Sequence, residues 1–230
     1  RFNTCECRTA TLGRPDRARV PDLRSCSNIG IVMKTGGIIL CGGKSSRMGT
    51  SKAMLPVGDE LMLQRVVRIL GEEVQPLVVV AAVDQELPAL PDEVQIVRDS
   101  QPGRGPLQGL RDGLSALPDG VEAAYATSCD VPLLKREFVR RMIDSLGEDE
   151  IAVPRDGKFH HPLAAVYRTS IVPKIDQLLE EDRLRPVYLF ESCDTREIEV
   201  EELRCADAHL ASMLNCNTLE GYREAMEKLT

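Results

Sequence analysis

Between residues 33 and 150, short aliphatic runs alternate with stretches of helical periodicity. The clearest run is Pro76-Leu-Val-Val-Val-Ala-Ala82, which is typical of a strand covered on both faces. Further strands are predicted at 38–41, 94–98 and 123–127, and helices at 61–70, 105–117 and 136–146. Repeated strand–helix units predict an α/β fold, a single three-layer, doubly wound domain with a mostly parallel sheet.

After Glu150 the regular alternation of predicted strands and helices ends. Residues 151–154 and 163–167 read as a hairpin-like pair with a turn at Asp156-Gly157. Helices are predicted at 171–182 and 219–229. No linker divides this part from the first, so we expect residues 33–230 to form one domain.

Residues 1–32 differ from the rest, since they are rich in Arg, Ser, Thr and Pro and lack an apolar period. They contain no apolar core of a secretory signal. We expect a disordered leader or a mis-assigned start, with translation beginning at Met33.

The first predicted strand leads into Leu40-Cys-Gly-Gly-Lys-Ser-Ser-Arg-Met-Gly-Thr-Ser-Lys-Ala-Met-Leu-Pro56. From Lys34 to Gly58 there is no Asp or Glu, although the chain carries a net charge of −7. Glycines let backbone N–H groups approach a ligand, and Lys and Arg neutralise phosphate. The stretch predicts a polyphosphate-binding loop at the carboxyl end of a parallel strand. It fits neither the P-loop nor the G-x-G-x-x-G spacing, and a basic surface loop is the alternative.

Two acidic residues follow later strands. Asp130 comes directly after the strand at 123–127, before Pro132, where its carboxylate could hold Mg²⁺ beside a polyphosphate. An N-cap or Asx-turn is the alternative. Asp99 follows the strand at 94–98, and glycines around Pro106 predict a tight turn into a helix N-terminus that favours anions. An ordinary loop and N-cap is again the alternative.

Two amides stand near the C-terminus, at Asn215 and Asn217. On an extended segment they would face the same side and could both reach a cleft. Capping of the last helix by Asn217 or Thr218 is the alternative. The adjacent His160 and His161 would face opposite sides of a strand, so we do not expect them to share a metal.

The loop at 40–56 resembles the signature L-x-G-G-x-S-x-R-M-G-x-x-K-x-x-L-P of the sugar-nucleotide-transferase-like nucleotidyltransferases. Within that superfamily the chain looks most like the molybdenum cofactor guanylyltransferase family, and the resemblance covers nearly everything after Met33. It implies a Rossmann-like nucleotidyltransferase fold, with residues 33–132 as the NTP-binding half and 133–230 as the acceptor-binding half.

The resemblance also implies roles for individual residues. Arg47, Lys52 and Asp130 would be catalytic, the first two as phosphate clamps and Asp130 as the metal ligand. Asn215 and Asn217 would lie on the acceptor side. Nucleotide contacts would come from Leu40, Cys41, Gly42, Gly43, Lys52, Asp99, Gly105, Pro106 and Asp130.

The implied reaction transfers GMP from GTP to molybdenum-loaded molybdopterin with Mg²⁺ as cofactor, and releases pyrophosphate. Transient contacts with other molybdenum cofactor biosynthesis proteins or with apo-molybdoenzymes would accompany that role. A CTP-dependent molybdopterin cytidylyltransferase, a sugar-1-phosphate nucleotidyltransferase and a nucleotide-binding regulator stay open as alternatives. Two places depart from the family pattern: Ser51 replaces an acid before the lysine, and Ala81-Ala-Val-Asp84 stands where an Asn often follows the second strand.

Composition and hydropathy limit the classes of partner that we expect for this chain. The acidic balance argues against a nucleic-acid surface. No apolar run approaches the roughly 20 residues needed to span a membrane, so we expect no membrane partner. The chain has eight cysteines without a C-x-x-C pair, and a reduced cytoplasmic protein is the simplest interpretation.

Overall fold

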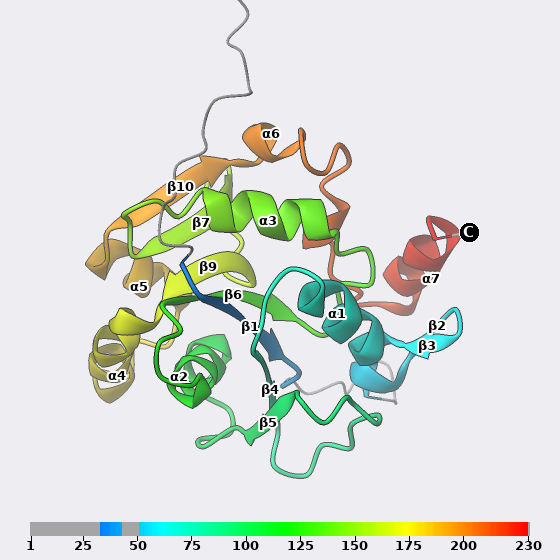
Figure 1. Ribbon diagram of the computed structural model, residues 1–230, viewed down its shortest axis with the longest axis horizontal. Coiled ribbons are helices and arrows are strands. Elements are labelled where there is room, and N and C mark those ends of the chain that lie inside the picture. Colours follow the sequence, from blue (N-terminus) through cyan, green and yellow to red (C-terminus); the bar gives the residue numbers. More distant parts are fainter. Residues whose placement is uncertain (1–32, 43–50, 230) are drawn as a thin grey trace, which may run out of the picture. The chain divides into compact units, whose positions relative to one another are not determined.

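The aliphatic runs form the centre of an eight-stranded mixed sheet, with strand order β10-β7-β9-β6-β1-β4-β5 and β8 paired to β7 (Figure 1). The computed structural model describes residues 33–42 and 51–229. The strands are β1 (Thr35–Leu40), β4 (Leu77–Ala81), β5 (Gln95–Arg98), β6 (Ala123–Ser128), β7 (Ile151–Asp156), β8 (Phe159–His160), β9 (Ala164–Arg168) and β10 (Thr195–Glu199). A separate small hairpin joins β2 (Pro56–Val57) to β3 (Glu60–Leu61).

Helices cover both faces of the main sheet. They are α1 (Met62–Gly71), α2 (Pro106–Ala116), α3 (Arg136–Asp144), α4 (Val172–Glu180), α5 (Pro186–Ser192), α6 (Val200–Leu203) and α7 (Leu219–Glu227). Short 3₁₀ turns lie at Lys52–Met54, Thr169–Ile171 and Ala211–Met213. In the described chain no helix combines the length and apolar composition needed to cross a bilayer.

Two hydrophobic cores lie on opposite faces of the sheet. One packs Val66 of α1, Phe138 of α3 and Leu203 of α6 against the sheet, and the other packs Leu110 of α2 and Leu178 of α4. These three layers confirm the predicted α/β fold. The strands and helices expected from periodicity are present, with ends that differ by at most three residues.

The second half of the chain completes the sheet in a way that the sequence predicted only in part. β9 runs antiparallel to β7, as the hairpin-like pair led us to expect, and it also pairs antiparallel with β6, which the sequence did not predict. The turn after Asp156 has Gly157 at φ +57° and leads into β8. β10 was not predicted, because its sequence contains no apolar run. It adds a parallel edge strand beside β7.

Parallel pairing fixes where the site residues meet. β6, β1, β4 and β5 are mutually parallel neighbours, so their carboxyl ends lie at one edge of the sheet. Leu40 pairs with Ser128 at the end of this register. The segments that follow β1, β5 and β6 therefore begin at the same edge, and these carry Gly42, Asp99 and Asp130.

Candidate active site

Lys52 and Asp130 form an ion pair at this edge of the sheet. Nζ of Lys52 lies 2.6 Å from Oδ2 of Asp130, and both side chains are largely buried, at 20% and 7% exposure. Lys52 begins a 3₁₀ turn, whereas Asp130 follows the last residues of β6. The fold thus joins two residues that the sequence singled out separately.

Neighbouring groups orient Asp130. The hydroxyl of Ser128 donates to Oδ1 at 2.5 Å, while Lys52 donates to Oδ2. Each carboxylate oxygen therefore accepts a hydrogen bond from a donor in a defined position. The motif around Asp130 does not by itself mark Ser128, although a residue two positions before Asp130 on a strand faces the same side of the sheet.

Asn217 completes the cluster. Its Oδ1 accepts a hydrogen bond from Nζ of Lys52 at 2.6 Å. Thr218, not Asn217, caps α7, because its hydroxyl accepts a hydrogen bond from Gly221 N at the start of the helix. Asn215 and Asn217 are exposed on either side of buried Cys216, the alternation expected of an extended segment.

The segment before Asn217 is anchored to the loop that follows Asp130. Cys216 N donates to the Asp130 carbonyl at 2.8 Å. Buried Asp207 accepts from Ser212 N and Oγ at 2.8 and 2.9 Å, and Lys135 Nζ lies 2.9 Å from its other oxygen. No local pattern could have revealed this network, since it joins positions far apart in the sequence.

Two cysteines flank the carboxylate and remain protonated. Burial, together with the negative charge of Asp130, raises the pKa of Cys216 to about 11, although Lys52 opposes this. A hydrogen bond with Cys129 and burial raise the pKa of Cys41 well above its usual value. Neither thiol is suited to nucleophilic catalysis at neutral pH.

The other predicted nucleotide-binding residues that the structure describes lie in two places, at the end of β1 and between β5 and the start of α2. Leu40 ends β1, buried Cys41 follows it, and exposed Gly42 comes next. Asp99 follows β5, and its Oδ1 accepts from Gln101 N at 3.0 Å. Gly105, with φ +79°, is the N-cap of α2, and Pro106 is the first residue of the helix. Gly43 and Arg47 lie outside the described residues.

Gln85 lies beside the two positions that depart from the family pattern. Its Oε1 accepts from Ala82 N, and its Nε2 donates to Oγ of Ser51, both at 3.2 Å. A side chain from the loop after β4 is thereby tied to the residue before Lys52. No sequence pattern marks Gln85 as a site residue.

Asp130 offers a single carboxylate to a metal ion. Among residues 33–42 and 51–229, no three His, Cys, Asp or Glu side chains gather as a metal centre. A single carboxylate suits Mg²⁺, which commonly takes one or two carboxylates together with phosphate oxygens and water. His160 instead contacts Glu197 at 2.7 Å, and burial lowers the pKa of His161.

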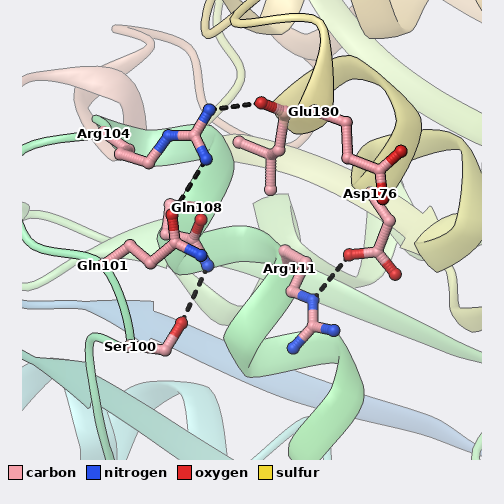
Figure 2. A pocket seen from close by; sticks show the side chains of 8 residues that line it. Ser100, Gln101, Arg104, Gln108, Arg111, Asp176 and Glu180 are labelled. Atoms are coloured by element: carbon pink, nitrogen blue, oxygen red, sulfur yellow. Dashed lines mark hydrogen bonds and ion pairs between the residues drawn. The ribbon is translucent and has the colours of Figure 1, made fainter.

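A pocket of about 320 Å³ lies elsewhere, between α2 and α4 (Figure 2). It is lined by Ser100, Gln101, Arg104, Gln108, Arg111, Asp176, Leu179 and Glu180. None of the predicted site residues is among them, so this pocket is separate from the Lys52–Asp130–Asn217 cluster.

Comparison with known proteins identifies the family. The family model of the MobA-like NTP transferase domain matches residues 37–195. A probable molybdenum cofactor guanylyltransferase of Mycobacterium tuberculosis H37Rv is 34% identical over 198 residues, which cover 83% of this chain and 92% of that protein.

Solved structures support the same fold. Molybdopterin-guanine dinucleotide biosynthesis protein A from Archaeoglobus fulgidus superposes with a TM-score of 0.69 at 20% identity, covering 86% of this chain and 98% of its own. A Mycobacterium tuberculosis H37Rv protein in complex with manganese gives a TM-score of 0.60 at 18% identity, over 84% and 98%. The chain therefore belongs to the molybdenum cofactor guanylyltransferase family and is a nucleotidyltransferase of molybdenum cofactor biosynthesis.

Proposed function

We propose that this chain transfers GMP from GTP to the phosphate of molybdenum-loaded molybdopterin and releases pyrophosphate. The observation that carries the proposal is the Lys52–Asp130–Asn217 cluster at the carboxyl edge of β1 and β6. It presents one ammonium group, one carboxylate and one amide where open α/β sheets bind ligands. The family membership supplies the substrate class.

In the proposed reaction, an oxygen of the acceptor phosphate attacks the α-phosphorus in line. The bond from the α-phosphorus to the bridging oxygen breaks, and pyrophosphate leaves with the electron pair. The second pKa of a phosphate is about 6, so the nucleophile is already ionised near neutral pH. The reaction then needs no general base.

Charge builds on the leaving pyrophosphate, where Lys52 would stabilise it. In the unliganded arrangement Lys52 is held by Asp130 and Asn217, so a bound triphosphate would compete with these two oxygens for its ammonium group. Asp130 is the residue that would hold Mg²⁺, which when bound neutralises phosphate charge. Ser128 would keep the carboxylate oriented.

One observation favours a second candidate for the nucleotide base. The stretch Ala81-Ala-Val-Asp84 stands where the family often has an Asn, and Gln85 forms hydrogen bonds with Ala82 N and Ser51 Oγ beside it. A CTP-dependent enzyme would keep the same cluster and the same chemistry with another base. The five cysteines in the described part are free thiols, which fits our proposal that the enzyme acts in the reducing cytoplasm.

The variant Asp130→Asn tests the cluster. It keeps the size of the side chain but removes the charge that would hold the metal, so turnover should fall by more than about 100-fold. Nucleotide binding, measured by calorimetry, should stay within a few-fold of the parent protein. Asp119→Asn is the matched control, because Asp119 is an exposed carboxylate before β6, at the other end of the same strand. Full activity of Asp130→Asn, with the fold intact, would overturn the proposal.

A further inference from the structure

Arg65 of α1 connects the two segments that supply the Lys52–Asp130 ion pair. Its Nε donates to the carbonyl oxygen of Pro132 at 2.7 Å, in the loop that begins with Asp130. Its Nη1 lies 3.2 Å from Oε1 of Glu60, in the hairpin that follows the Lys52 turn. One guanidinium group thus contacts both segments, although these contacts are made with neighbours of the ion pair and not with the pair itself.

The loop after Asp130 is held through three successive carbonyl groups. The carbonyl oxygens of residues 130–132 accept hydrogen bonds from Cys216 N, Leu134 N and Arg65 Nε, at 2.8, 3.1 and 2.7 Å. The first two donors are backbone groups, which every variant keeps. The third is a charged side chain, and hydrogen bonds from charged donors are stronger than those from neutral donors. Arg65 is therefore the donor among these three that a substitution can remove.

The hairpin that carries Glu60 is in turn tied to the Lys52 segment. Glu60 pairs with Val57 across β2 and β3. Met62 N donates to the Leu55 carbonyl at 2.8 Å, which closes the chain between the Lys52 turn and α1. Figure 1 shows the hairpin beside α1. A shift of the Lys52 segment would therefore move Glu60 as well.

α1 gives Arg65 a rigid base. The helix buries Leu63, Val66 and Leu70 completely, at 0% exposure, in the core that it shares with the sheet. The Arg65 side chain is 21% exposed, so most of it is packed against the protein. Groups carried by packed helices keep their positions more closely than groups carried by loops.

We propose that Arg65 is a positioning residue, which fixes the Asp130 carboxylate relative to the Lys52 ammonium group. The inference rests on the proposed function of these two residues. Arg65 touches no reacting group in this role and acts through Pro132 and Glu60. A displacement of about 1 Å at a catalytic group can lower a rate by roughly 100-fold, so the loss of this support should lower turnover more than nucleotide affinity.

Arg65→Met and Arg68→Met form a matched pair of variants. Arg68 lies one turn further along α1 and also binds Glu60, through Nη2 at 2.7 Å and Nε at 3.1 Å. It is 51% exposed, and its Nη1 lies 3.3 Å from the Glu72 carboxylate. Both variants remove an arginine from Glu60, but only Arg65→Met removes the hydrogen bond to Pro132.

The kinetics of pyrophosphate release by the full chain measure the effect on turnover. With GTP, Mg²⁺ and molybdenum-loaded molybdopterin, Arg65→Met should lower kcat by about 10- to 100-fold and raise the half-saturating Mg²⁺ concentration by about ten-fold, as for groups that orient metal ligands. KM for GTP should stay near the parent value, and Arg68→Met should match the parent in all three quantities. Arg65→Lys keeps a charged donor without the fork, so it should recover part of the lost kcat.

Hydrogen exchange provides a measurement that needs no turnover. Leu134 N and Cys216 N donate to carbonyls of the same loop, so both amides should exchange about ten-fold faster in Arg65→Met, the effect of one lost hydrogen bond. Arg68→Met should leave both amides unchanged. Glu60→Gln loosens the hold on Arg65 without removing it, so it should give the same changes at smaller size, and it guards against misfolding of Arg65→Met.

Two results would overturn the proposal. In the first, folded Arg65→Met keeps the kcat and the Mg²⁺ requirement of Arg68→Met and shows only a lower unfolding midpoint, as a merely structural residue would. In the second, the two variants exchange equally at Leu134 and Cys216. If the parent chain releases no pyrophosphate, the guanylyltransfer proposal fails, whereas the exchange comparison still decides whether Arg65 holds the loop.

Discussion

Lys52 is the residue on which the proposed chemistry depends most. Its ammonium group is shared between Asp130 and Asn217, which come from distant parts of the chain. Replacing Lys52 by Met should lower kcat/KM for NTP-dependent pyrophosphate release by about 10²–10³-fold, as for other preorganised charge-stabilising donors. Lys34→Met is the control, because Lys34 is exposed and precedes β1 at its opposite end. A Lys52→Met enzyme with more than half of the parent activity would refute the assignment.

The thiols around Asp130 should be inert. With the pKa of Cys216 raised to about 11, roughly one molecule in a thousand carries the thiolate at pH 8. Cys205 is exposed and serves as the internal reference. Iodoacetamide at pH 8 should alkylate Cys205 and spare Cys216 and Cys41, as peptide mass spectrometry would show. Alkylation of native Cys216 as fast as Cys205 would contradict the described burial.

At the scale of single residues, local patterns predicted the members of the cluster but not their contacts. The sequence singles out Lys52 because it lies in a glycine-rich basic loop, and Asp130 because a charged residue directly after a buried strand is unusual. Ser128 and Gln85 did not, since a hydroxyl or an amide gains meaning only from the atom that it reaches in the fold. Roles toward the nucleotide for Asp99, Gly105 and Pro106 remain predictions.

Among the elements, the C-terminal segment is held in place by buried Asp207. Burial alone would raise the pKa of its carboxyl, but hydrogen bonds from Ser212 and the ion pair with Lys135 lower that pKa below its usual value. A lowered pKa means that the carboxylate stabilises the fold above about pH 4, its unfolded value, and that this contribution is lost as the pH falls through the folded value.

Asp207→Ala should therefore lower the free energy of unfolding at pH 7 by about 3 kcal/mol, because it leaves Lys135 and Ser212 without their shared partner. The loss should shrink toward pH 3, where the parent carboxyl is increasingly protonated. Urea denaturation at several pH values measures both effects. Glu201→Ala removes an exposed ion pair with Arg204 and should change nothing. Equal stability of Asp207→Ala at pH 7 would contradict the network.

The packing of α2 on β1 requires a glycine. A Cβ at Gly113 would lie 2.6 Å from Cγ2 of Ile38, and the β-branched side chain has little freedom to move. Gly113→Ala should destabilise the protein by about 1–3 kcal/mol in thermal or urea unfolding. Gly221→Ala in α7 is the matched control, where the nearest atom is 3.4 Å away and no loss is expected. Similar stability of the two variants would argue against this close approach.

Periodicity predicted the elements that are buried on one or both faces. It missed β10, whose sequence Thr-Arg-Glu-Ile-Glu is mostly charged and buries only Ile198 well. Charged residues are how natural edge strands avoid unwanted pairing, so an apolar pattern cannot reveal them. The short α5 was missed for a related reason, because seven residues show too little of a helical period.

On the scale of the whole molecule, the parallel strands β6, β1, β4 and β5 bring the loops of the first half to one edge, which follows from the α/β class predicted by the sequence. The return of the segment that carries Cys216 and Asn217 to that edge does not follow from the class. It depends on Asp207, on the Cys216–Asp130 backbone hydrogen bond and on a small core in which Met62, Leu133 and Cys216 pack together. Such long-range contacts have no counterpart in local sequence patterns.

The most direct test of the account is pyrophosphate release with molybdenum-loaded molybdopterin and Mg²⁺, compared for GTP, CTP, ATP and UTP. We expect release with GTP alone, and its loss in Asp130→Asn. Release with CTP instead would keep the cluster and the mechanism but contradict the base assignment. No release with any of the four, from a folded protein that binds NTP, would contradict the central claim.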